Sequence, residues 1–268
     1  MASAPAALGP VGNTGAALPA SPRPAPRAAR VTDRGIVRHD AVRTERWKAN
    51  GTVKVSGGVD VTTADVTGTI SVGGALTAGS FRARGTLDVD GTVEVRELLA
   101  ARGNVHCSAT VHALDLSLVG TVRIGGAVSV DRTFTLRGVL HAPSVTAGVL
   151  EVDGSVEVPG EVRALNLLAD LRHRSTLGSV RARRVRLRGR APNVVDKVFF
   201  HLDPVTVERI EADSVELESV DVAFVRAKEI VLGRHAHVTA VEGTIVRRHP
   251  SSSVGPESKS PPPYGLRR

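Results

Sequence analysis

The sequence predicts an all-β protein: a single-chain parallel β-helix, or β-solenoid, triangular in cross-section and with about 17 residues in each coil. Three observations carry this prediction. Glycines recur at a nearly constant spacing, short pairs of apolar residues lie between them, and aromatic residues make up only 3% of the chain. Globular cores usually rely on large aromatic rings, so their scarcity favours a narrow interior filled by Val, Leu, Ala and Ile.

The repeat is most regular in the middle of the chain. Seven glycines follow one another there at a nearly constant separation of about 17 residues. A constant period of this length is typical of solenoids, in which each repeat forms one coil. The seven residues are Gly51, Gly68, Gly85, Gly103, Gly120, Gly138 and Gly154.

Apolar residues keep fixed positions after each glycine. One alternating pair, such as Val53 and Val55, is followed by a second, such as Val59 and Val61, and by a third before the next glycine. Alternation with period 2 predicts three short strands whose apolar side chains point inward, with small residues at the corners. One side of the coil is shorter than the others, which favours the right-handed form of the helix.

The array divides the chain into five predicted segments. Residues 1–46 are interpreted as a disordered basic tail, because Ala, Pro, Gly and Arg dominate them without apolar periodicity. Coils are expected over 47–190 and again over 205–248, separated by an irregular interruption at 191–204. Residues 249–268, rich in Ser and Pro, are expected to form a second disordered tail.

The coils change frame after residue 178, where an eight-residue motif occurs three times. Its copies lie at residues 180–187, 210–217 and 225–232. When the first two copies are aligned, each extended by its following residue, four arginines of the first copy lie opposite four acids of the second. The arginines are Arg181, Arg183, Arg186 and Arg188, and the acids are Glu211, Asp213, Glu216 and Glu218.

These arginines have two interpretations. Stacked coils would place opposite charges side by side, and such cross-strand pairs stabilise a sheet by about 0.2–1 kcal/mol each. Alternatively, the segment from Arg172 to Arg190, with eight arginines and no acid, forms an anion-binding stripe. Arg181, Arg183, Arg186 and Arg188 are then the candidate anion-binding residues.

The glycine-punctuated coils, the flanking tails and the run Val225–Gly233 followed by Val241 and Glu242 resemble the bactofilins, polymer-forming bacterial cytoskeletal proteins. The resemblance covers about residues 50–245. It implies a right-handed β-helix that assembles end to end into filaments without a nucleotide, and membrane or cell-envelope attachment through a terminal tail in some members. The chain differs from the compact family core in its length and in the interruption at 191–204.

A solenoid exposes unpaired backbone groups and apolar side chains at each end, and open ends that stack on one another generate a filament. The sequence therefore predicts a homopolymer that scaffolds other proteins. Trp47 is expected to cap the first coil, and Phe199 and Phe200 to form a lateral contact or a plug. The apolar residues of the predicted terminal coils are Val53, Val55, Val59, Val61, Ile230, Leu232 and Val238.

An alternative function is a capped, monomeric binding module. The formal net charge of +8 fits recruitment of an anionic partner, such as a membrane surface or a cell-envelope polymer, through the basic tail or the arginines. Nucleic acid is the less favoured partner. The single cysteine favours a reducing compartment, so the expected location is the cytoplasm, with attachment to the inner face of the membrane as an option.

No catalytic, metal or cofactor site is predicted. His106 and His141 share an outward position but lie two coils apart, about 10 Å by the strand spacing, which is too far for one metal ion. Cys107 takes an inward position and is expected to be a small core residue. The outward positions hold no cluster of acids and no phosphate-binding loop, so neither an enzymatic activity nor a small-molecule substrate is expected.

Overall fold

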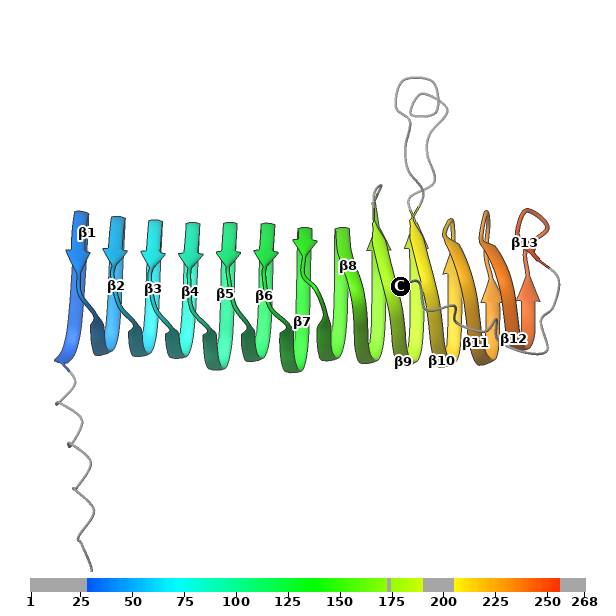
Figure 1. The fold of residues 1–268 in the computed structure, drawn as a ribbon, viewed down its shortest axis with the longest axis horizontal. Coiled ribbons are helices and arrows are strands. Elements are labelled where there is room, and N and C mark those ends of the chain that lie inside the picture. The colour runs from blue at the N-terminus through cyan, green and yellow to red at the C-terminus, as the bar shows by residue number, and fades with distance from the viewer. Residues whose placement is uncertain (1–27, 173–174, 190–204, 256–268) are drawn as a thin grey trace, which may run out of the picture.

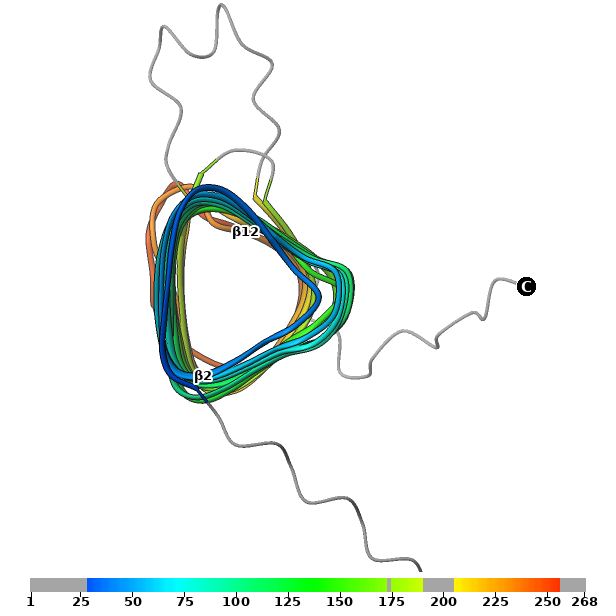
Figure 2. The same ribbon diagram turned by 90° about the vertical axis from the view of Figure 1, so that its left-hand side faces the viewer.

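The computed structural model describes residues 28–172, 175–189 and 205–255. These residues form one parallel sheet of 13 strands, in which neighbouring strands follow one another in chain order. Figure 1 shows the coils stacked along a single axis, and Figure 2 shows their triangular cross-section. The predicted all-β solenoid is confirmed.

Most strands continue around a corner of the triangle, so one strand contributes to more than one side. β8 is the longest of the described strands, with 27 residues. The strands are β1 (Ala28–His39), β2 (Val42–Val55), β3 (Val59–Val72), β4 (Leu76–Val89), β5 (Val93–Cys107), β6 (Val111–Ile124), β7 (Val128–His141), β8 (Val145–Leu171), β9 (Thr176–Gly189), β10 (Thr206–Glu218), β11 (Asp221–Leu232), β12 (His237–Arg248) and β13 (Ser253–Val254).

The repeating glycines form one corner of the triangle. Gly51 pairs with Gly68, and Gly68 pairs with Gly85. From Gly51 to Gly154 their φ angles lie between 115° and 150°, a region that side chains with a Cβ rarely adopt. A Cβ on Gly68 would also lie 2.1 Å from the carbonyl oxygen of Gly51. Glycine is therefore required at this corner, and its spacing sets the coil length.

The core is a continuous column of apolar side chains inside the triangle. Buried residues from Val42 to Val241 belong to this one cluster, and the rings of Trp47, Phe81 and Phe134 are fully buried within it. Each fully buried Val or Leu contributes about 1.5–3 kcal/mol relative to an exposed one. The narrow, largely aliphatic interior agrees with the sequence prediction.

The predicted N-terminal boundary is wrong. β1 pairs along its length with β2, so the described solenoid already includes Ala28, well before residue 47. Gly35, with φ at 78°, pairs with Gly51 and adds one more coil before the seven repeating glycines. The apolar pattern fails in this coil because Asp33 and His39 stand opposite the inward residues of the next one.

The predicted C-terminal boundary is also too short. β13 pairs with the first residues of β12, so the solenoid continues beyond residue 248 to Val254. The predicted interruption at 191–204 lies outside the described residues. On either side of it the register is preserved, because Leu177 pairs with Val207.

The coils after the interruption are shorter than those before it. Val207 pairs with Val222 and Val222 with Val238, so these coils are one or two residues shorter than the usual coil of the first half. Here Ser219 and His235 adopt φ angles of 54° and 52°. This left-handed helical conformation is open to non-glycine residues, so these turns do not require glycine.

Candidate functional site

The N-terminal end of the solenoid is the outer edge of β1, whose neighbour among the described strands is β2 alone. Val31 and Val37 are only half-buried there. Asp33 points inward between them and is 7% exposed. Its Oδ2 accepts hydrogen bonds from Trp47 Nε1 at 2.8 Å and from His39 Nε2 at 3.0 Å. These bonds offset the cost of placing a carboxylate in an otherwise apolar position.

This arrangement corrects the expected N-terminal assembly residues. Because β1 and β2 cover them, they lie inside the solenoid rather than at its end. Trp47 is likewise fully buried in the second coil and does not cap the first. The four residues expected at this end have exposed fractions of only 1–2%. They are Val53, Val55, Val59 and Val61.

The C-terminal end is formed by β12 and β13. β13 covers only the first two residues of β12, so the rest of that strand has β11 as its one described neighbour. Ile245 and Val254 pack against the core but are only partly buried. Arg248 lies opposite Leu232 in the register, and its Nη2 donates a hydrogen bond to the carbonyl oxygen of Ser252 at 3.3 Å.

The expected C-terminal assembly residues also lie one coil inside the end of the described solenoid. Ile230 and Leu232 are covered by β12, and Val238 is covered by β13. All three are at most 2% exposed. Phe199 and Phe200 lie outside the described residues. The two ends of the described solenoid are therefore β1 on one side and β12 with β13 on the other.

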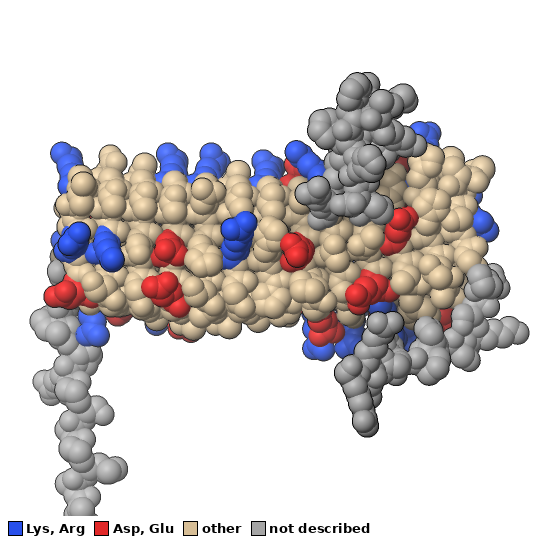
Figure 3. Space-filling view, turned by 45° about the horizontal axis from the view of Figure 1, so that its top comes forward, with Lys and Arg blue, Asp and Glu red and all other residues tan. Residues whose placement is uncertain are grey.

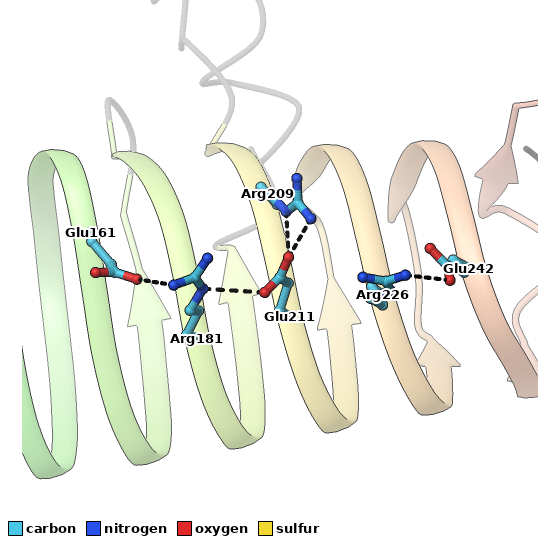
Figure 4. A network of polar contacts seen from close by, with 6 residues as sticks. All are labelled: Glu161, Arg181, Arg209, Glu211, Arg226 and Glu242. Atoms are coloured by element: carbon cyan, nitrogen blue, oxygen red, sulfur yellow. Dashed lines mark hydrogen bonds and ion pairs between the residues drawn. The ribbon is translucent and has the colours of Figure 1, made fainter. Parts of the chain in front are cut away.

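The predicted charge ladder is present in the second half of the solenoid. Arg181 pairs in register with Glu211, and their side chains approach to 3.2 Å (Figure 4). Arg186 lies 3.3 Å from Glu216. Arg188 lies 3.5 Å from Glu216 and 3.6 Å from Glu218. Three of the four candidate anion-binding arginines are thus engaged with acids of the next coil.

The ladder extends beyond the predicted pairs. Glu161 contacts Arg181 from the preceding coil at 3.1 Å, and Arg209 forms an ion pair with Glu211 (Figure 4). Burial alone would raise the pKa of Glu211, but the hydrogen bonds and charges of Arg209 and Arg181 outweigh it and lower that pKa. One coil further, Arg226 lies 2.8 Å from Glu242.

Arg183 differs from the other three arginines because it forms no ion pair with another described residue. The nearby Asp213 is instead paired with Lys228 of the next coil at 2.8 Å. The hydrogen bond and charge of Lys228 lower the pKa of Asp213, with a smaller contribution from Arg183. The ladder interpretation therefore accounts for Arg181, Arg186 and Arg188, and an anion that bound to these three would have to displace existing ion pairs.

Another group of arginines lies in the first half of the solenoid. Arg82, Arg84, Arg102 and Arg137, with Asp65, line a groove of about 490 Å³ over β3 to β7, and none of the four arginines is ion-paired with another described residue. Figure 3 shows Lys and Arg side chains along the upper edge of this part of the solenoid. The sequence signal is that three of them directly precede a repeating glycine: Arg84, Arg102 and Arg137.

The remaining candidate residues have structural roles. Cys107 is buried, as predicted, and burial raises the pKa of its thiol. His141 Nδ1 lies 2.7 Å from Glu157 Oε2, across adjacent coils. No group of three or more potential metal ligands occurs among the residues that the structure describes.

The fold and its ends define a parallel β-solenoid whose two ends have unpaired edges among the described strands. No described helix is long and apolar enough to cross a membrane. No protein-family model matches the sequence, and searches of curated proteins and of solved structures found no match either.

Proposed function

We propose that this protein is a structural, non-enzymatic, bactofilin-like polymer that assembles end to end without a nucleotide and scaffolds other proteins. The observation that supports the proposal most strongly is that, among the described strands, no further strand lies beside β1 at one end or beside most of β12, with β13, at the other. Each edge offers backbone groups that a second copy can pair with. Stacking in this way does not close on itself, so the product is a filament.

The packing at both ends supports the same proposal. Val31 and Val37 at one end, and Ile245 and Val254 at the other, continue the core but are only partly covered. An added coil would complete their burial. The proposed location is the cytoplasm, where the chain could also attach to the inner face of the membrane or to cell-envelope proteins.

The test is assembly of the purified full-length chain in the absence of nucleotide. We expect sedimentable polymer and filaments by negative-stain electron microscopy. Protein that stays monomeric at every salt concentration would contradict the proposal.

At each end of the solenoid, a partly buried residue and its exposed neighbour can be substituted in the same way, so that one variant is the control for the other. Ile245 packs against the core at the C-terminal end, whereas the neighbouring Val246 is 63% exposed. Ile245→Glu places a charge in the contact and should abolish sedimentation, while Val246→Glu should leave it nearly unchanged. Val37→Glu and Ile36→Glu form the same comparison at the other end, because Val37 is half-buried and Ile36 is 84% exposed. Equal effects within either pair would argue against end-to-end contact.

A second candidate function is recruitment of an anionic partner, as in a capped binding module. The observation that favours it is the groove lined by Arg82, Arg84, Arg102 and Arg137. One acid, Asp65, also lines it, opposite Arg82 in the register, but none of the four arginines forms an ion pair with a described residue. Arginine presents a planar fork of donors that suits carboxylates and phosphates. No aromatic side chain lines the groove, so it lacks the surface on which nucleic-acid bases stack.

Sedimentation with vesicles containing an anionic phospholipid tests this second function. Replacing Arg84, Arg102 and Arg137 together by Gln should weaken binding and leave stability unchanged. The matched control replaces Arg181, Arg186 and Arg188 by Gln, which should lower stability and have little effect on binding. Binding that depends only on the control set would favour the original arginine stripe instead.

A further inference from the structure

One column of register partners runs along the described solenoid and carries opposite charges at its two ends, a buried acid at the first and an exposed arginine at the last. It begins with Asp33, which pairs with Ala49, and it ends with Arg248, which pairs with Leu232. All eleven members between the two charges are apolar and buried. Register pairs connect Ala49, Val66, Ala83, Ala101, Leu118, Leu136 and Val152, and then Ala169, Leu187, Leu217 and Leu232. Val152 and Ala169, which join the two runs, lie about one coil length apart in β8.

Both charged groups keep unused hydrogen-bonding capacity. The two hydrogen bonds that Asp33 accepts, from Trp47 and His39, involve Oδ2. Its Oδ1 has no partner among the described residues. Arg248 uses one Nη2 donor for the carbonyl oxygen of Ser252, which leaves further donors of its guanidinium group.

We propose that two copies join head to tail, with β1 of one copy continuing the parallel sheet beyond β12 and β13 of the other. This inference rests on the proposed function and specifies the joint. Continuing the columns places Asp33 over Arg248, Val31 over Ile245 and His39 over Val254. The joint would then pair a carboxylate with a guanidinium group and bury the apolar residues that each end leaves partly exposed.

The outward charges favour this polarity over a contact between two N-terminal ends. β1 carries Arg30, Arg34 and Arg38 on its exposed face, and a joint between two such ends would gather six arginines. In the head-to-tail joint, Arg30 of one copy would lie over Thr244 of the other, and Arg38 would lie over Ser253. Both of these facing residues are uncharged. Like charges brought together across an interface disfavour the contact.

A charge exchange tests the pairing of Asp33 with Arg248. Asp33→Arg and Arg248→Asp should each raise the concentration needed for sedimentation by about tenfold or more, because like charges then meet at every joint. An equal mixture of the two variants should assemble again, since each joint regains one acid and one base. The double variant should also assemble alone. Thermal melting of each variant checks that the solenoid is folded.

Disulfide trapping tests the polarity without altering Asp33. The joint places Arg38 beside Ser253 on neighbouring strands, at about 4.8 Å, a separation that a disulfide can bridge. A mixture of Arg38→Cys and Ser253→Cys proteins should form a mixed disulfide dimer on oxidation. Wild-type protein, whose single Cys107 is buried, is the control.

The outcomes separate this inference from the proposed function. If the wild-type protein forms filaments but Arg38→Cys forms disulfides only with itself, the head-to-tail joint is overturned and end-to-end assembly stands. The same conclusion follows if the mixture of Asp33→Arg and Arg248→Asp does not regain assembly. A folded wild-type protein that stays monomeric would overturn both.

Discussion

The two halves of the solenoid build the same triangular cross-section by different means. In the first half, glycines from Gly51 to Gly154 share a corner that excludes any Cβ, and the coils keep a nearly constant period. In the second half, shorter coils turn through Ser219 and His235, and ion pairs connect successive strands. The backbone fixes the register in one half, while side-chain charge contributes to it in the other.

The same difference decides which arginines can meet a partner. Arg181, Arg186 and Arg188 are occupied by acids of the next coil. Arg84 and Arg102 are adjacent to each other across a strand pair and have no acid beside them among the described residues. A high density of arginine in the sequence is therefore a poor guide to a binding surface when stacked coils supply acids in register.

The largest expected effect is the loss of a corner glycine. In Gly85→Ala the new Cβ would lie 2.2 Å from the carbonyl oxygen of Gly68, at a φ of 118°. We expect the free energy of unfolding to fall by about 3 kcal/mol, measured by denaturant titration. Gly35→Ala is the matched control, because its φ is 78° but no atom lies within 4 Å of the new Cβ. A loss of about 1 kcal/mol is expected there, and equal losses would contradict the steric account.

A smaller effect is expected from reversing a charge in the ladder. Arg181→Glu would place an acid between Glu161 and Glu211 and should cost about 1 kcal/mol. The loss should shrink at high salt, because these side chains are partly exposed and screened. Arg102→Glu is the comparison in the first half and should change stability by less than about 0.5 kcal/mol. If both reversals cost the same, the ladder does not stabilise the second half.

The smallest expected effect is on the response to acid. The pKa of Glu211 is lowered in the folded chain, so its contribution to stability is present at neutral pH and is lost as pH falls through that lowered pKa. Glu211→Gln should therefore be less stable than wild type at pH 7, and the difference should narrow at low pH. Denaturant titrations at a series of pH values check this prediction, and curves that stay parallel would refute it.

The sequence predicted the regular part of the fold well, because a corner that admits only glycine leaves a visible period. It also predicted the pairing of Arg181 with Glu211, since the two motif copies share their apolar frame. It failed at the ends of the solenoid. Asp33 and His39 break the apolar pattern of the first coil, and Arg248 does so in the last, so alternation alone places the boundaries too far inside.

The arginine groove was missed for a different reason. Arg84, Arg102 and Arg137 are separated by one or two coil lengths and become neighbours only after the chain is wound. Their shared position before a glycine was visible in the sequence. Arg137 stands opposite Asp153 in the register, but Asp153 forms its ion pair with Arg172, and repeat spacing does not specify which of two arginines an acid contacts.

The most direct test of the account is electron cryomicroscopy of the full-length protein polymerised without nucleotide. Head-to-tail stacking of the open ends predicts filaments in which the parallel sheet continues across each joint at the strand spacing of about 4.8 Å and every copy points the same way. Filaments with two-fold axes between copies would contradict the head-to-tail joint. Folded particles that stay single under all conditions would contradict the central claim that the open ends drive assembly.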